Sequence, residues 1–451
     1  MVAALVLNVG AASAGCGSDV TGLEALPLEA PAVASDAVDA APEVIPSVSV
    51  PQPGDVLITG GIGKAGLAIG STQLYSASTG TFVNTPAMGA ARAAHQALIF
   101  PAQHEVLIVG GFKGKAKIKG SSMALKITTL ATGRIYHTDK GTFGLLKSKM
   151  LSAKSDDDRA FFPALTLQSG LGFLPSGLCN GDIRPTAFDF DSGLSTFQLL
   201  SNRVVTARAF HTATLLGNGK VLIAGGITTL GGNTTNTAEI FDPSIGSFTA
   251  TGNMIDSRAG HTATLLPSGK VLIAGGVTSS ASTVSSSTFT SLNTAEIFDP
   301  TANAGVGAFS AAPNMTAFRW EHTATLVGGT VLIAGGFNGV ATWTLAAVGK
   351  DSGDAGSWTP TAGSIEDSAE IYDPVANTFT PTTLPMNVAR FAHTATLLNS
   401  GDVLIVGGFG GVNLGTPLNS TELFTPASGG SFTAGPTLKA PRAWHTATLI
   451  Q

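Results

Sequence analysis

Charged residues are scarce in this 451-residue sequence and make up only 12% of it. Lysine and arginine together number 24, against 29 aspartate and glutamate residues, so the formal net charge is −5. Without an excess of basic residues, the chain lacks the positive surface with which proteins bind the phosphates of nucleic acids. We therefore expect no nucleic acid among its partners.

Cysteine is almost absent, since the chain holds only Cys16 and Cys179. Two cysteines cannot form the disulfide framework that stabilises many small secreted domains. No apolar run approaches the ~20 residues that a membrane-spanning helix requires. We therefore expect any contact with a membrane to depend on another device, such as a covalent lipid.

A candidate for that device lies at the N-terminus. Residues 1–15 are small and mostly apolar, as in an export signal, and end at Cys16. Ser13-Ala14-Gly15-Cys16 resembles the lipobox of bacterial lipoproteins, in which the cysteine becomes the lipidated first residue. The resemblance implies an exported protein held at the cell envelope through Cys16. The alternative is a signal cleaved without lipidation, which gives a secreted protein. No Lys or Arg precedes the apolar run, which leaves a start further upstream open.

Residues 16–50 differ in composition from the rest of the chain. Ala, Pro, Val and Ser dominate, and there is no Lys or Arg. The acidic residues of this segment are Asp19, Glu24, Glu29, Asp36, Asp39 and Glu43. Such a segment repels itself and cannot bury a core, so we expect a flexible tether.

From residue 51 onward, one stretch recurs. Residues 208–226 begin with Arg208, continue with His211 and end with two glycines, and near copies occupy 258–276, 319–336 and 390–408. A weaker copy spans 92–111, and the chain ends with the first half of another, 442–450. A seventh copy begins at Arg159, with Phe162 at the histidine position and Ser176-Gly177 at the double glycine. Recurrence at roughly 50 residues is typical of repeat architectures.

Each unit contains four short strand signals. His-Thr-Ala-Thr-Leu-Leu is the first, Val-Leu-Ile-Ala before Gly-Gly the second, Ala-Glu-Ile-Phe-Asp the third, and a run around Ser-Phe-Thr the fourth. The third and fourth signals carry paired aromatics, at Tyr75/Phe82, Tyr136/Phe143, Phe190/Phe197, Phe241/Phe248, Phe298/Phe309, Tyr372/Phe379 and Phe424/Phe432. Each element therefore occurs seven times.

The double glycine, the aromatic before Asp-Pro and the later aromatic resemble the kelch repeat. The resemblance runs from about residue 51 to the end and implies one all-β domain, a seven-bladed β-propeller over 51–451. The domain opens with a second-strand signal at 55–61 and closes with a first-strand signal at 445–450. We therefore expect the C-terminal strand to complete the N-terminal blade, which removes the exposed edges of a linear array. The expected state is a monomer.

Function is expected on one face of this propeller. The loops between second and third strands vary in length, and they share a face with the connections that lead to each first strand. Two residues between the repeated Arg and His differ from unit to unit and are expected to surround the channel mouth. The candidate binding residues are Phe161, Phe210, Trp320, Glu321, Phe391 and Trp444, together with Trp343 and Trp358 of the longest loop. Exposed aromatics suit sugar rings or peptide side chains, and local packing under the loops is the alternative.

The repeated histidines and arginines are expected to serve the blades, because a group present in every blade has a structural task. Some kelch propellers are copper oxidases that need two tyrosines, a cysteine and histidines around the metal. Here Tyr75, Tyr136 and Tyr372 all occupy the repeated aromatic position, and Cys179 is the one cysteine of the domain. We therefore expect no metal and no cofactor.

The resulting prediction is a binding protein that recognises a protein or glycan at the cell surface and is not an enzyme. The alternative is a sugar-active enzyme, because other kelch propellers are sialic acid mutarotases, and Glu321 near Arg319 could transfer a proton. Lysines alternate at positions 113, 115, 117 and 119 in one loop. They are expected either to meet an acidic partner or lipid headgroup, or to form a solvated strand edge.

Overall fold

The computed structural model describes residues 50–119, 122–146, 158–179, 182–229, 232–283, 286–344, 357–411 and 416–451. Strands dominate these ranges. Within these ranges, helical structure is confined to the one-turn α1 (Ala302–Gly305) and two short 3₁₀ turns at Pro101–Gln103 and Ala427–Gly429. Among the described residues, no helix is long and apolar enough to cross a bilayer. The predicted export signal, Cys16 and the tether lie outside the described residues.

The strands form seven four-stranded antiparallel sheets within the described ranges. The first strands are β38 (Thr446–Leu449), β4 (Gln96–Phe100), β10 (Leu165–Thr166), β16 (Thr212–Leu215), β20 (Thr262–Leu265), β26 (Thr323–Val327) and β32 (Thr394–Leu397). The second strands are β1 (Val56–Thr59), β5 (Glu105–Val109), β11 (Gly172–Pro175), β17 (Val221–Ala224), β21 (Val271–Ala274), β27 (Thr330–Ala334) and β33 (Val403–Val406).

The outer half of each sheet continues the same order. The third strands are β2 (Thr72–Ser76), β8 (Gly133–His137), β14 (Ala187–Asp191), β18 (Ala238–Asp242), β24 (Ala295–Asp299), β30 (Ala369–Asp373) and β36 (Thr421–Thr425). The fourth are β3 (Thr81–Asn84), β9 (Thr142–Leu145), β15 (Thr196–Leu199), β19 (Ser247–Ala250), β25 (Ala308–Ala311), β31 (Thr378–Pro381) and β37 (Ser431–Ala434). The predicted all-β propeller is confirmed. We number the blades 1 to 7 from the sheet that contains β1.

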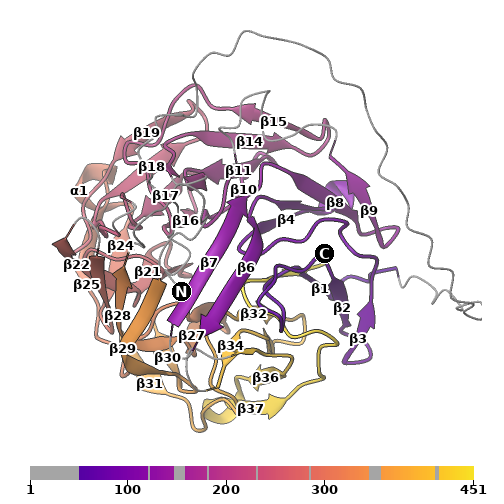
Figure 1. Cartoon of the computed structure of the whole chain (residues 1–451). Coiled ribbons are helices and arrows are strands. Elements are labelled where there is room, and N and C mark those ends of the chain that lie inside the picture. The colour runs from indigo at the N-terminus through magenta and orange to yellow at the C-terminus, as the bar shows by residue number, and fades with distance from the viewer. Residues whose placement is uncertain are drawn as a thin grey trace, which may run out of the picture.

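The ring is closed by the two ends of the domain. β38 pairs antiparallel with β1, with Val56 opposite Leu449 and Thr59 opposite Thr446. The first strands of successive blades are neighbours, and β38 in turn lies beside β4, so they surround one axis (Figure 1). The C-terminal strand therefore completes blade 1, as the order of the strand signals predicts.

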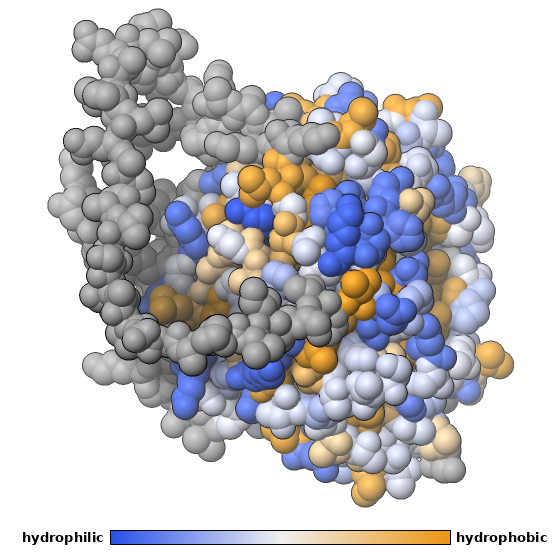
Figure 2. Space-filling view, turned by 90° about the vertical axis from the view of Figure 1, so that its right-hand side faces the viewer, coloured by the Kyte–Doolittle hydropathy of each residue, from blue (hydrophilic) through white to orange (hydrophobic). Residues whose placement is uncertain are grey.

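The core lies between the blades. Second strands such as β17 and β21 are buried along their whole length because both of their faces are covered by neighbouring sheets. One cluster combines Leu222 of blade 4 with Val271 and Phe298 of blade 5. The paired aromatics of third and fourth strands contact each other, as Phe241 and Phe248 do at 4.6 Å between ring centroids. The rim seen in Figure 2 carries hydrophilic side chains interspersed with small apolar patches.

The repeated arginines are inside the blades. All seven are fully buried, at 0–1% exposure. In blade 4, Arg208 donates from Nη1 to the carbonyl of Gly225 (2.7 Å) and from Nη2 to Glu239 (2.9 Å). Blades 5, 6 and 7 repeat the ion pair as Arg258–Glu296, Arg319–Glu370 and Arg390–Glu422. These arginines tie the connection before each first strand to its own sheet.

The double glycine is needed because the next blade packs directly against it. Gly225 adopts φ +63°, and a Cβ there would come within 2.6 Å of the Arg258 carbonyl and of the His261 ring. Blade 3 departs from this arrangement, since Ser176 occupies the first glycine position with φ 51°. The hidden repeat is nevertheless a complete sheet, β10-β11-β14-β15, although β10 has only two residues.

Three loops after the double glycines form a sheet of their own. β6 (Phe112–Lys119), β7 (Ser122–Thr129), β22 (Val277–Thr283), β23 (Ser286–Ser291), β28 (Phe337–Thr344) and β29 (Ser357–Ile365) pair in the order β22-β23-β28-β29-β7-β6. β6 and β7 lie across the centre of the ring (Figure 1). The sequence predicts variable loops on this face, but it does not predict that loops of three blades join.

Candidate functional site

The channel mouth is built by the residue that precedes each repeated histidine, or Phe162 in blade 3. We call these seven residues the ring positions; they are Ala94, Phe161, Phe210, Gly260, Glu321, Ala392 and Trp444. All seven adopt φ between 50° and 60°. Six of them donate a backbone N–H to the carbonyl of the ring position in the preceding blade, at 2.9–3.3 Å. Main-chain hydrogen bonds therefore link neighbouring blades around the axis.

The residue directly after each arginine points elsewhere. We call these the anchor positions; they are Ala93, Ala160, Ala209, Ala259, Trp320, Phe391 and Ala443. Each forms a β-bridge with the residue after a double glycine, as Trp320 does with Phe337. Trp320 and Phe391 are each only 1% exposed. The prediction that both surround the mouth is therefore wrong, because their β-bridges hold the anchor positions beneath the loops, whereas the ring positions line the central cavity.

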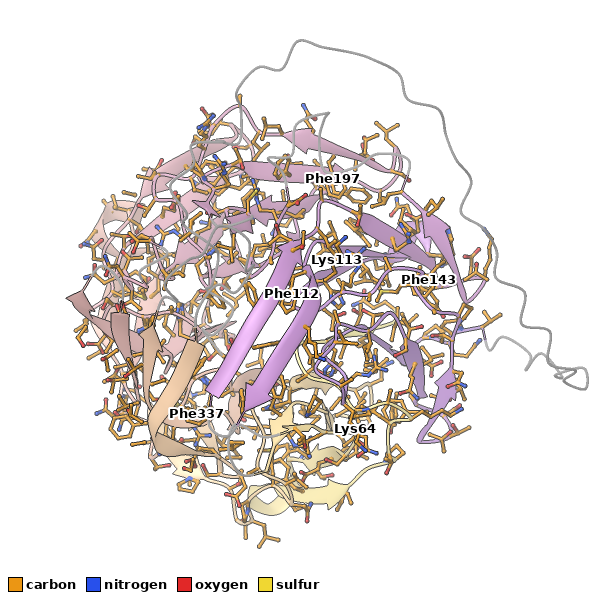
Figure 3. All side chains as sticks on the ribbon, in the orientation of Figure 1. Lys64, Phe112, Lys113, Phe143, Phe197 and Phe337 are labelled. Atoms are coloured by element: carbon orange, nitrogen blue, oxygen red, sulfur yellow. The ribbon has the colours of Figure 1, made fainter. Side chains whose placement is uncertain are left out.

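Figure 3 shows Phe112 near the centre of the ring and Phe337 closer to one side of it. Both belong to the layer of side chains that covers the anchor positions, together with Phe409, which stacks on Phe391 at 5.3 Å. The aromatics of the anchor positions are thus packed beneath the loops, which was the alternative to a binding role.

The ring positions line the central cavity, which has a volume of about 530 Å³. Phe161 and Phe210 stack on each other at 4.5 Å, and Trp444 meets the edge of Phe161 at 6.3 Å. These three side chains are 7–9% exposed. Sequence reasoning placed them at the mouth, and the structure brings them together around one side of it.

Glu321 lies in the same ring. Trp444 donates its indole N–H to Glu321 Oε2 at 3.4 Å, which spans the intervening blade at Ala392. Glu321 is the one acidic or basic side chain, apart from histidines, among the described residues that line the cavity. The arrangement offers a carboxylate beside aromatic faces, in a cavity otherwise lined by small, hydroxyl and imidazole groups.

The histidines are neutral members of the wall. In five blades the imidazole Nε2 forms a hydrogen bond with a threonine hydroxyl of the preceding first strand, as His261 does with Thr212 at 3.1 Å. Burial, and then the adjacent arginine, lower the pKa of each well below its usual value; for His322 it falls to about 3. These groups do not carry the positive charge that would attract an anion.

His211 is the exception. The threonine position of blade 3 is occupied by Pro163, which has no hydroxyl to offer. Among the described residues, no side-chain hydroxyl forms a hydrogen bond with either ring nitrogen of His211, although both nitrogens are buried. Burial, followed by Arg208 and His261, lowers the pKa of His211 well below its usual value, and the Pro175 carbonyl acts in the opposite direction. The seam between blades 3 and 4 is therefore chemically different from the others.

The two remaining candidate residues, Trp343 and Trp358, belong to the six-stranded sheet that the loops of three blades form. Trp343 of β28 is directly opposite Trp358 of β29, and Trp358 is also paired with Met123 of β7. Their backbones thus lie at the junction of two loops. Their side chains are outside the described part of the structure, so their predicted role in binding stays a prediction.

No family model matches the chain, and no curated protein matches it. Among solved structures, it is similar to a fungal alcohol oxidase of the AA5 family in complex with copper. The TM-score is 0.56 at 18% identity, over 81% of this chain and 70% of the oxidase. It is also similar to YjhT, with a TM-score of 0.50 at 12% identity, over 77% of this chain and 99% of YjhT. Likenesses at this identity show the fold, which is that of a kelch-type propeller.

The residues of this chain do not fit a copper site. Tyr75, Tyr136 and Tyr372 are buried between blades against their paired phenylalanines. Cys179 is buried in β12 (Leu178–Cys179), and the histidines are spread around the ring. Within the described ranges, no group of three or more His, Cys, Asp or Glu side chains could hold a metal ion.

The prediction that the chain is not an enzyme needs correction. Its fold is shared with an alcohol oxidase, so a kelch-type scaffold gives no ground for excluding catalysis. The likeness transfers no activity, because function resides in a site and not in a fold. Whether the chain can catalyse a reaction therefore depends on the residues that line its cavity.

Proposed function

We propose that this protein is a sugar-active enzyme that binds a reducing sugar in its central cavity and uses Glu321 as the acid–base group. The observation that carries the proposal is the position of Glu321, whose carboxylate stands in the cavity wall beside Trp444. The cavity volume of about 530 Å³ lies within the range of small-molecule sites.

The surroundings of Glu321 support a sugar as the substrate class. Trp444, Phe161 and Phe210 line the cavity, and the 7–9% of their surface that stays exposed gives an apolar patch for the C–H side of a pyranose. Thr394 and Thr446 line the same cavity and can exchange hydrogen bonds with sugar hydroxyls. Apart from Glu321 and the neutral histidines, the described lining of the cavity has no ionisable side chain, and such a lining suits a neutral polyol ring.

The simplest reaction open to a single carboxylate is the interconversion of anomers. Glu321 takes the proton of the anomeric hydroxyl, the C–O bond to the ring oxygen breaks, and the anomeric carbon becomes a carbonyl. The ring oxygen then receives the proton from Glu321, which gives the open-chain sugar. Closure on the other face of the carbonyl reverses these steps and restores the carboxylate, so no co-reactant is consumed.

The test is the rate of anomer exchange, measured by NMR on the neutral sugars D-galactose, D-glucose and N-acetyl-D-glucosamine with the full chain. We expect acceleration over the spontaneous rate for at least one of them, and Glu321→Gln to reduce it by about 10²–10⁴-fold. Trp444→Phe keeps the apolar face but removes the indole donor, so a smaller loss is expected. Absence of acceleration for all three sugars, or an unchanged rate in Glu321→Gln, would contradict the proposal.

We also propose that the protein is exported and works at the cell envelope, lipid-anchored through Cys16. The apolar run of residues 1–15 before this cysteine supports the proposal. Mass spectrometry of the mature N-terminus tests it, with a diacylated Cys16 as the expected result. A mature N-terminus that begins after residue 16 and carries no lipid would overturn it.

A further inference from the structure

The β6–β7 hairpin that crosses the ring has two unlike faces. Phe112 is fully buried, stacks on Phe161 at 5.6 Å and lies 6.3 Å from Trp444. On the other side Lys113, Lys115 and Thr128 are exposed. The hairpin is therefore anchored over the ring by its apolar face and turns its other face to solvent.

The outward face is strongly basic. Residues two apart share a face of a strand, and directly opposite residues of paired strands share it too. Positions 117 and 119 thus fall on the face of Lys113, and Lys126 is paired with Lys115. Lysine occupies all of these positions, and the face contains no Asp or Glu. Like charges directly opposite each other destabilise a sheet, so the face favours an anionic partner.

Lys64 extends this strip. It is exposed on the loop whose Leu67 bridges Lys115 of β6, and the Ala68 N–H donates to the Gly114 carbonyl at 3.1 Å. We define the basic face as Lys64, Lys113, Lys115, Lys117, Lys119 and Lys126.

The lysines of the basic face differ from those of the blades. Lys220 and Lys270 are paired with Asp242 and Asp299, each at 2.9 Å. No ion pair between described residues involves Lys64, Lys113 or Lys115. The charges of Lys64, Lys113 and Lys115 are thus not neutralised by the described part of the propeller.

The chain itself contains a complementary segment. Residues 17–49 carry six carboxylates and no Lys or Arg, against the six lysines of the basic face. This segment joins the propeller at Val50, and Gly54 donates to Ile450 at the C-terminal end of β38. It therefore enters from the side of the ring opposite the hairpin. A chain of this length can extend about 110 Å, which exceeds a path around one blade whose four strands lie about 4.8 Å apart.

We propose that the acidic segment 17–49 docks on the basic face of the β6–β7 hairpin. The two partners belong to one chain, so the contact forms at a high effective concentration and does not depend on protein concentration. It is held by exposed charges and is therefore weakened by salt. This inference is independent of the proposed enzymatic activity, because it rests on charge and chain length alone.

The experiment uses the full chain, produced without export, with a nitroxide label on Cys16. Cys179 is 1% exposed and does not compete for the label under native conditions. Paramagnetic broadening of the backbone amides of β6 and β7 is measured by NMR in low salt and in high salt. We expect the amide signals of 113–119 to lose at least half of their intensity in low salt and to recover in high salt.

Charge variants decide whether the basic face is responsible. Lys113→Glu with Lys115→Glu is expected to abolish the broadening, and Asp36→Lys, Asp39→Lys and Glu43→Lys added to that pair are expected to restore it. Lys220→Glu with Lys270→Glu is the matched control outside the basic face and is expected to leave the broadening unchanged.

Three outcomes would overturn the proposal. One is the absence of broadening at β6 and β7 in low salt. Another is equal loss in the control variant, which would indicate unspecific attraction. The third is binding of anionic lipid vesicles or polyglutamate to the full chain with the same affinity as to a variant whose acidic segment is neutralised, because the face would then be free for an external partner.

Discussion

Blades 4 to 7 differ from blades 1 to 3 in the groups that surround their buried arginine. Each blade buries an arginine, but only blades 4 to 7 provide a glutamate for it on the third strand. The equivalent positions of blades 1, 2 and 3 are Gln73, Arg134 and Phe188. Arg159 instead lies over the Phe188 ring at 5.3 Å. The buried arginine is thus common to all seven blades, whereas the glutamate on the third strand is confined to blades 4 to 7.

The two halves also differ in electrostatics. In blades 1 and 2, burial lowers the pKa of Arg442 and Arg92 to about 10, and Arg134 contributes to the shift of Arg92. In blade 4 the carboxylate of Glu239 counteracts part of the same effect on Arg208. The basic face of the hairpin begins in blade 2 as well. Blades 1 and 2 therefore carry buried arginines that no glutamate of the third strand balances. In blades 4 to 7 the third-strand glutamate balances the arginine of the same blade.

The largest difference in stability between the two groups of blades is expected when the glutamate that accepts hydrogen bonds from the buried arginine is removed. Glu239→Ala leaves Arg208 buried without the carboxylate that it contacts and also removes the acceptor for the Val205 N–H (2.6 Å). The free energy of unfolding is expected to fall by about 3–5 kcal/mol. Gln73→Ala, at the same position of blade 1, is expected to cost about 1 kcal/mol. Denaturant titration of both variants measures the difference, and equal losses would contradict the distinction between the two halves.

A smaller effect is expected from the histidines under acid. The folded pKa of His393 is well below 6.5, so it stays neutral in the blade while the unfolded chain takes up a proton below about pH 6.5. Stability is therefore lost as the pH falls from 6.5 toward the folded pKa. His393→Phe copies the Phe162 of blade 3 and is expected to reduce the loss between pH 7 and pH 5 by about 2 kcal/mol. Unfolding curves of both proteins at the two pH values test this, and parallel pH dependence would refute it.

The smallest effect concerns the seam between blades 3 and 4. Pro163→Thr offers His211 the hydroxyl that the other histidines have, whereas Pro163→Ala removes the ring of proline without offering one. We expect the threonine variant to be more stable than the alanine variant by about 1 kcal/mol. Thermal or denaturant unfolding of the pair gives the answer, and equal stability would show that the two blades do not approach as they do elsewhere.

Repetition explains what the sequence could predict. The strand order, the closure of blade 1 by residues 446–449 and the hidden blade with Phe162 all follow from matching copies of one unit. The ring positions could be found too, because they are where the copies differ. The distinction between Glu321 and its neighbour Trp320 could not, since it depends on which residue of the pair faces the axis. The joining of β7 to β29 brings together loops more than 200 residues apart, and no local signal predicts it.

The main-chain bonds between ring positions have a consequence for how such a protein can change. Ala, Phe, Gly, Glu and Trp all occur there with nearly the same backbone geometry, and six of the seven links between ring positions are made by the main chain alone. Exchanging one of these residues alters what the channel presents while leaving its construction intact. New specificities are therefore accessible in single steps, and the mouth can evolve faster than the blades that carry it.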